Sequence, residues 1–223
     1  MSSLLLPPAP APPTDEKPPE LVNGDRLTNA EFMRRYEAMP GVTAELINGV
    51  VFIMPSPVRH TQHGGPIYML LRWLGAYCDL HPELIPGTNS TTFLGEGQIP
   101  QPDGYLIRPV SAGGNASIDE SGYIHGPAEV VCEVAASPVS VDANAKADMY
   151  AEAGVKEYLL WRTAERPEPT IDWFQLRDDG LYHPLEPDAD GVIESVVFPG
   201  LRLDRPALLR GDLPAVLAAV SAE

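Results

Sequence analysis

The 223-residue sequence has little cysteine and no long apolar run. Its two cysteines, Cys78 and Cys132, lie in apolar contexts without the spacing of a metal site, which indicates buried thiols rather than a disulfide or a zinc centre. We therefore expect a reducing, cytoplasmic location. The apolar runs are too short for a membrane span, and the first residues lack a basic leader, so neither a membrane anchor nor a signal peptide is expected.

Positive charge is also scarce, because 15 Lys and Arg residues face 31 Asp and Glu residues, for a formal net charge of -16. Proteins that hold a phosphate backbone usually cluster Lys and Arg, since counterion release supplies most non-specific affinity. The adjacent pair Arg34-Arg35 fits the solvated face of a helix better. The charge weighs against a nucleic-acid enzyme, although part of it falls in late stretches such as Glu186 to Asp190 and need not face a substrate.

The composition is that of a globular protein, with 44% hydrophobic residues and enough length for one domain with a substantial core. Prolines between Pro7 and Pro19 favour an extended, disordered tail. We therefore expect a tail over residues 1–24, one folded domain over residues 25–210, and a C-terminal helical tail over residues 211–223.

A helix and a hairpin are predicted first. Thr28-Asn-Ala-Glu31 is a capping box, from which a helix should run to about Ala38. Asn48-Gly49 separates two β-prone runs, which predicts a two-residue hairpin because both turn positions need positive φ. A longer helix is predicted from His60 or Thr61 to Tyr77, with one apolar face made of Ile67, Leu70, Leu71, Leu74 and Tyr77.

The second half of the chain alternates between strands and helices. A helix from Val141 to Ala153, closed by Gly154 as a left-handed cap, would give a strand–helix–strand unit of a mixed α/β sheet. The Gly- and Ser-rich residues 111–126 are expected to form a loop, and a last short helix is expected near 214–220. Strands are predicted at residues 91–94, 104–107, 129–134, 157–161, 170–176 and 181–183.

Two acidic residues are candidates for a metal-binding site. Glu133 lies inside an apolar run, where a buried carboxylate is costly unless it is paired, hydrogen-bonded or bound to a metal. A strand that leaves Glu133 on a wet face is the alternative, but it would expose Val131 as well. Asp103 stands in Pro102-Asp103-Gly104, which is also an ordinary turn sequence. Together the two acids are suitable ligands for a hard cation such as Mg²⁺.

Lys146 and Tyr150 share one face of the predicted helix because they are four residues apart. The short connection before that helix must fold it back near the end of the strand holding Glu133, which would bring Lys146 within reach of the metal. A solvated surface lysine is the ordinary alternative. His60 and His63 could meet a phosphate or a metal, although histidines at a helix start are more often structural when no third ligand is near.

The sequence resembles the Uma-two family of restriction endonucleases, a branch of the PD-(D/E)XK nuclease superfamily. The resemblance covers about Leu27 to Leu208. Its pieces follow in matching order and spacing: Ala44 to Gly49, Ser56 to His60, Gln101 to Asp103, Val131 to Pro138, Lys146 to Trp161, and Phe198 to Leu201.

The resemblance implies an α/β fold, a restriction-endonuclease-like mixed β-sheet core flanked by helices, with an N-terminal helix and β-hairpin. It also implies Asp103 and Glu133 as ligands of Mg²⁺ or Mn²⁺, joined by the backbone carbonyl of Val134. The superfamily's lysine usually sits two residues after the second acid, a position held here by Ala135. The lysine is then expected at Lys146.

Four further residues are expected around this set. Lys156 is a weaker substitute for the catalytic lysine, because it lies past the helix. Glu45 matches the family pattern as a further acid, with a water-facing carboxylate on an edge strand as an equal alternative. Tyr150 would help to fix the lysine or close the core, and His60 is kept as a supporting residue.

The predicted function is a Mg²⁺-dependent endonuclease that hydrolyses phosphodiester bonds of DNA. Lys146 would orient or stabilise a metal-activated water. Two alternatives stay open: a nuclease fold that serves as a binding or regulatory module, and a metal-dependent hydrolase of small phosphoesters, for which an acidic surface is less of a handicap. DNA is the expected partner, a homodimer is left open, and no membrane partner is expected.

Overall fold

The protein is described from a computed structural model, which covers residues 17–54, 58–136, 141–164 and 168–221. The helical elements are α1 (Asn29–Tyr36), the π-helical turn η1 (His60–Gly64), α2 (Gly65–Leu80), the 3-10 turn η2 (Val110–Ala112), α3 (Val141–Ala153), α4 (Arg205–Arg210) and α5 (Leu213–Ala218). The strands are β1 (Ala44–Ile47), β2 (Val50–Ile53), β3 (Ile85–Gly87), β4 (Thr92–Phe93), β5 (Gly104–Ile107), β6 (Ser117–Ile118), β7 (Ile124–His125), β8 (Val130–Ala135), β9 (Glu157–Arg162), β10 (Thr170–Leu176), β11 (Tyr182–Pro184), β12 (Val192–Glu194) and β13 (Arg202–Asp204).

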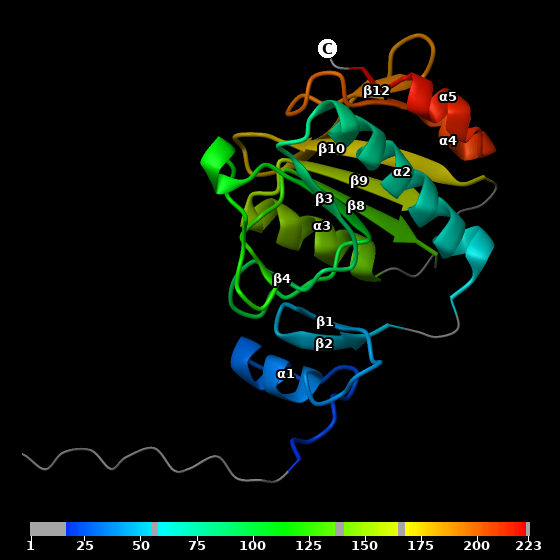
Figure 1. Cartoon of the computed structure of the whole chain (residues 1–223). Helices are drawn as coiled ribbons and strands as arrows, with labels where there is room; N and C mark the ends of the chain where they lie inside the picture. The colour runs from blue at the N-terminus through cyan, green and yellow to red at the C-terminus, as the bar shows by residue number, and fades with distance from the viewer. Residues whose placement is uncertain (1–16, 55–57, 137–140, 165–167, 222–223) are drawn as a thin grey trace, which may run out of the picture.

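A six-stranded mixed sheet forms the centre, in the order β11-β10-β9-β8-β5-β3. Strands β8 and β9 are parallel, with Val130 opposite Glu157, and the other neighbours are antiparallel. Helix α3 is the crossover between the two parallel strands, which is the connection that parallel pairing requires. Figure 1 shows α2 lying across one face of this sheet and α3 on the other. The predicted mixed α/β fold is confirmed.

Alternation along β8 divides the interior into two cores. Val130, Cys132 and Val134 join the cluster that includes Leu70 and Trp73 of α2. Val131 belongs instead to a second cluster on the α3 side, with Met149 and Tyr150 among its members. Because side chains alternate along a strand, Glu133 is placed on the same face as Val131, towards α3.

The N-terminal segment forms a separate layer beside the sheet (Figure 1). Its core contains the fully buried Phe32, Leu46, Val51 and Ile99. Leu46 and Ile99 exchange two backbone hydrogen bonds, of 3.1 and 2.7 Å, and so join the hairpin to the segment that leads into β5. This connection positions β1 next to the main sheet.

Local sequence signals explain the start of this layer. Asn48 and Gly49 have φ values of 52° and 72°, and β1 pairs with β2 around them, which confirms the Asn-Gly hairpin. Thr28 Oγ1 accepts a hydrogen bond from the Glu31 backbone N–H, as the capping box predicts. The side chain of Glu31 binds Arg34 and Arg35 instead of closing the box, and the helix ends at Tyr36, two residues earlier than expected.

Several elements differ from the sequence expectations. Residues 111–126 are not all loop, because β7 pairs in parallel with β4 and antiparallel with β6, and short pairings of this kind carry no local signal. Helix α2 continues to Leu80 and buries Trp73, which the predicted apolar face omitted, while Ile67 and Leu71 are only half-buried. Elements β3, β12, β13 and α4 were not predicted either.

The expected boundaries at residues 24 and 210 do not coincide with a change in packing. Leu21 is buried in the N-terminal core, and Val216 of α5 is buried in the core on the α2 side. Residues 1–16, most of the expected tail, lie outside the described residues. Among the helices that are described, none combines the length and apolar character needed to cross a bilayer.

Candidate catalytic site

Two carboxylates, Glu45 and Glu133, meet the ammonium group of Lys146 beneath α3, and a third carboxylate, Asp103, lies near enough to affect their charges. Glu45 comes from β1, Asp103 immediately precedes β5, Glu133 lies in β8, and Lys146 lies in α3. All four residues are buried, with exposed fractions between 1% and 8%. Charged residues are seldom buried to this extent unless they are paired, so the cluster needs a chemical explanation.

Lys146 lies between two of the acids. Its Nζ is 2.8 Å from Oε2 and 2.9 Å from Oε1 of Glu45, and 3.2 Å from Oε1 of Glu133. Only the Glu45 Oε1 and Glu133 Oε1 contacts have the geometry of hydrogen bonds, and the Oε2 contact is purely ionic. The hairpin and the main sheet therefore share one counterion, although Glu45 and Lys146 are 101 positions apart in the chain.

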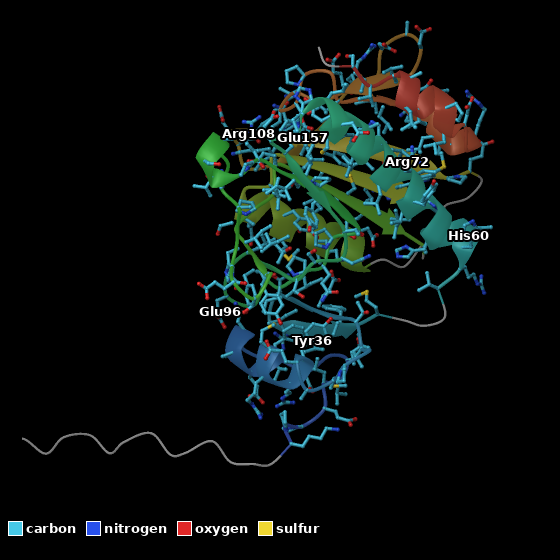
Figure 2. The ribbon with its side chains drawn as sticks, in the orientation of Figure 1. Tyr36, His60, Arg72, Glu96, Arg108 and Glu157 are labelled. Carbon is cyan, nitrogen blue, oxygen red and sulfur yellow. The ribbon has the colours of Figure 1, made fainter. Side chains whose placement is uncertain are left out.

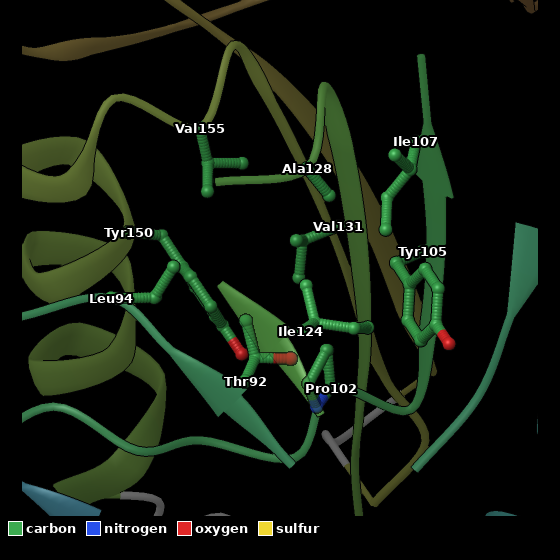
Figure 3. Close-up of a pocket in the computed structure, with 10 residues that line it drawn as sticks. All are labelled: Thr92, Leu94, Pro102, Tyr105, Ile107, Ile124, Ala128, Val131, Tyr150 and Val155. Carbon is green, nitrogen blue, oxygen red and sulfur yellow. The ribbon is translucent and has the colours of Figure 1, made fainter. Parts of the chain in front are cut away.

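Tyr150 adds a second donor to Glu133. Its hydroxyl donates a 2.7 Å hydrogen bond to Oε1, the same oxygen that Lys146 contacts. Figure 3 shows its ring descending from α3 beside a small apolar cavity. Packing around the cavity fixes the ring and so aims the hydroxyl, and the lining residues are Thr92, Leu94, Pro102, Tyr105, Ile107, Ile124, Ala128, Val131, Tyr150 and Val155.

Backbone groups hold the other two acids. The Val134 N–H donates a 2.8 Å hydrogen bond to Oδ2 of Asp103, and the Gln101 N–H donates a 2.7 Å hydrogen bond to Oε1 of Glu45. The second carboxylate oxygen of Asp103, Oδ1, lies 3.5 Å from Nε2 of His63. The Pro-Asp-Gly sequence thus delivers a buried carboxylate to the edge of β8 rather than an exposed turn residue.

Burial and mutual repulsion govern the charges in this cluster. Burial is the main cause that raises the pKa of Glu133 above its usual range; Lys146 opposes the shift, while Asp103 and Glu45 reinforce it. Burial likewise raises the pKa of Asp103, against the lowering effects of His63, the Val134 N–H and Lys146. Burial lowers the pKa of Lys146, but Glu133 and Glu45 more than reverse this, so the lysine stays charged.

The carboxylates of the cluster offer oxygen atoms, the ligand type that hard cations prefer. Among the described residues, no group of three or more His, Cys, Asp or Glu side chains is arranged to enclose a metal ion. Zinc usually takes three or four protein ligands, whereas Mg²⁺ keeps several waters and uses one or two carboxylates. Asp103 and Glu133 are two carboxylates of this kind, and Lys146 contacts Glu133 as well as Glu45. When ionised, the three carboxylates outnumber the single ammonium, and a divalent cation would balance the excess charge.

Two expected residues lie elsewhere. His60 is exposed at the start of η1, as Figure 2 shows, whereas His63, three residues later, faces Asp103. Lys156 is exposed in the turn before β9, away from the buried cluster. The bonds that Gln101 and Val134 donate through their backbones were not expected, because a sequence pattern carries no signal for main-chain donors.

Two comparisons with known proteins give matches that are described as nucleases. A family model, Uma2, with the description "Putative restriction endonuclease", matches residues 30–206. A solved structure from Anabaena variabilis, described as a "putative nuclease belonging to DUF820", has 13% sequence identity and a TM-score of 0.56. The match covers 82% of this chain and 97% of that one, and at such low identity it shows a shared fold. No curated protein matches the chain.

Proposed function

We propose, given that this chain belongs to the Uma2 family, that its buried cluster hydrolyses phosphodiester bonds of DNA with Mg²⁺ or Mn²⁺. Family and fold are those of a nuclease, and hence of a hydrolase acting on nucleic acid. The metal dependence, the choice of DNA and the roles of individual residues are our proposal. It rests on one observation: three carboxylates and a lysine from four distant segments are buried close enough to influence one another's charges.

Each group in the cluster has a role in this proposal. Asp103 and Glu133, with the backbone carbonyl of Val134, would hold the cation. When bound, Mg²⁺ lowers the pKa of a coordinated water and polarises the phosphoryl group. Lys146 carries a raised pKa, so it acts as a fixed positive charge and hydrogen-bond donor beside the nucleophile rather than as a base. Glu45 and Tyr150 keep Lys146 and Glu133 in place.

Glu157 provides a matched control for the acids of the cluster. It is another buried glutamate of the central sheet, and it accepts hydrogen bonds from Ser195, Val196 and Val197, away from the cluster. Glu157→Gln therefore tests the effect of losing a buried negative charge without touching the proposed catalytic groups. Glu133→Gln and Asp103→Asn remove a charge of the same kind from the cluster itself.

The test is cleavage of supercoiled plasmid in Mg²⁺ or Mn²⁺, with chelator as the blank. We expect the wild type and Glu157→Gln to cut the plasmid, and Asp103→Asn and Glu133→Gln to have lost cleavage by at least about 10³-fold. The cation should also raise the melting temperature of the wild type, because a ligand that binds only the folded state stabilises it. Full cleavage by either site variant would exclude the assigned ligands, and the absence of both cleavage and a thermal shift would exclude the proposal.

The formal net charge of -16 favours one second candidate, a metal-dependent hydrolase of small phosphoesters. A small substrate does not require the broad basic surface that a duplex does. A chromogenic phosphodiester separates the two: turnover of this compound without plasmid cleavage supports the small-substrate enzyme, and the reverse supports the DNA nuclease.

A further inference from the structure

His63 is a side chain outside the assigned set that contacts it. Its Nε2 lies 3.5 Å from Oδ1 of Asp103, slightly longer than an ordinary hydrogen bond. Hydrogen bonds at catalytic sites are often long before the substrate complex forms. The other carboxylate oxygen of Asp103 already accepts the Val134 N–H. His63 therefore faces the oxygen whose direction the backbone leaves unfixed.

The turn that carries His63 is anchored at the end of β8 that also binds Asp103. The Thr163 hydroxyl donates to the Gln62 carbonyl, and the Thr163 N–H donates a 3.0 Å hydrogen bond to the Ala135 carbonyl at the end of β8. The His63 N–H is bound to the Arg59 carbonyl, also at 3.0 Å. A π-helical turn widens the start of α2, and turns of this type are frequent at functional sites.

The surroundings of Nδ1, the second ring nitrogen of His63, indicate which nitrogen of the imidazole carries the proton. Nδ1 is buried and has no hydrogen-bond partner among the described residues. A neutral imidazole has one N–H donor and one acceptor nitrogen, and a buried N–H without a partner is costly. Placing the proton on Nε2 avoids that cost and directs the ring's single donor towards Asp103.

We infer that His63 is a positioning residue, which orients the carboxylate of Asp103 for its role in the centre. The inference rests on the proposed function, since it assigns a partner to a proposed metal ligand. Val134 and His63 then hold the two oxygens of Asp103 from different elements, β8 and η1. Groups that orient a metal ligand in this way typically contribute 10- to 100-fold in metal affinity or activity.

Three variants test the role of His63 in the full-length protein. His63→Ala removes the donor. His63→Gln keeps an amide N–H at nearly the position of Nε2, and His183→Ala is the control. His183 also pairs through Nε2 with a carboxylate, Asp179, at 2.8 Å, but on the exposed hairpin of β10 and β11.

Two readouts are combined. One is the Mn²⁺ concentration that gives half of the maximal rise in melting temperature, and the other is the split of cleavage between kcat and KM. We expect His63→Ala to raise the Mn²⁺ midpoint about 10-fold and to lower kcat with little change in KM. His63→Gln should restore both to within about threefold of the wild type, and His183→Ala should match the wild type.

The outcomes separate this inference from the function on which it depends. If the wild type binds Mn²⁺ and cleaves, and His63→Ala behaves identically, the positioning role is wrong while the nuclease stands. A loss in His63→Ala that glutamine does not restore also overturns the role, because the imidazole would then act through its shape and not through its donor. If the wild type itself shows neither a thermal shift nor cleavage, the proposed function fails first and the inference fails with it.

Discussion

Two buried glutamates on adjacent parallel strands have opposite surroundings. Glu157 begins β9 and Glu133 lies near the end of β8, so they occupy opposite ends of the same pair of strands. Oxygens of Glu157 accept hydrogen bonds from the Ser195 hydroxyl and from two backbone N–H groups of the following turn. Figure 2 shows Glu157 at the end of the molecule far from His60.

The difference between the two glutamates lies in their partners: those of Glu157 stabilise the fold, whereas those of Glu133 belong to the candidate site. The neutral donors around Glu157 satisfy its carboxylate and fix a turn, so nothing further is required there. Glu133 has one charged partner, Lys146, which it shares with Glu45, and a second acid, Asp103, reinforces the rise in its pKa. The first arrangement is complete as folded, whereas in the second burial opposes the ionisation of two acids that a bound cation would favour.

Removal of Lys146 should have the largest effect. Lys146→Met deletes the ammonium that Glu45 and Glu133 share, leaving two buried carboxylates without their partner. We expect a loss of about 3–5 kcal/mol in the free energy of unfolding, together with loss of cleavage. Chemical denaturation would measure the first effect, and the double variant Lys146→Met/Glu45→Gln should recover part of it. No loss in the single variant would mean that the pair is not buried in solution.

Truncation of Glu157 should come second, and it should affect stability alone. Glu157→Ala leaves the Ser195 hydroxyl and the N–H groups of Val196 and Val197 without their acceptor, at a cost of about 3 kcal/mol. The urea midpoint should fall while specific activity per folded molecule stays unchanged. A fall in activity without a fall in stability would reverse the contrast between the two glutamates.

Neutralising Glu133 should raise the free energy of unfolding in the absence of metal, whereas the two preceding variants should lower it. Glu133→Gln keeps an acceptor for Lys146 and Tyr150 and removes an acid whose pKa is raised to about 8. We therefore expect a gain of about 1 kcal/mol in chelator above that pH, where the folded wild type must ionise Glu133. The same substitution should abolish stabilisation by Mg²⁺. Melting curves with and without the cation measure both effects, and a destabilised Glu133→Gln protein in chelator would show that the cluster is not overcharged.

The pH dependence of stability that comes from Glu157 should be a smaller effect. Burial raises the pKa of Glu157 above the usual value of a glutamate, although its hydrogen bonds from Ser195, Val197 and Val196 oppose the shift. The folded state therefore holds this proton more tightly than the unfolded state, and the contribution to stability falls as pH rises from about 4.5 through the folded pKa. Subtracting the pH profile of Glu157→Gln from that of the wild type isolates this slope, and a difference that rises with pH would contradict it.

Local chemistry made much of this fold predictable. Asn48-Gly49 specified its turn because few residues tolerate positive φ, and the apolar run around Cys132 specified a buried strand. The short strands β6 and β7 could not be predicted, since their pairing with β4 is decided by tertiary contacts rather than by their own residues. The predicted face of α2 omitted Trp73, although this residue follows Leu70 by three positions and precedes Tyr77 by four, which is helical spacing.

The charged residues of the candidate site could be predicted from the sequence, but the contacts of Glu45 and His63 with them could not. Burial of Glu133 within an apolar strand and the four-residue spacing of Lys146 and Tyr150 are sequence-level signals. The choice between His60 and His63 was not, because the π-helical turn changes the periodicity that would place either ring. The role of Glu45 as the main partner of Lys146 was also hidden, since it depends on how the hairpin layer docks on the sheet.

The hairpin that carries Glu45 has a consequence for partly folded molecules. Its core of Phe32, Leu46 and Val51 is distinct from the two cores of the main sheet, and Ile47 of β1 is the buried side chain by which the hairpin joins the second of them. Local opening of this layer would need only those contacts to break. Each such opening withdraws the main counterion of Lys146 and the brace on Gln101. Under the proposed function, a nascent or fraying chain would thus carry a disassembled centre, and hydrolysis would have to wait until every layer is in place.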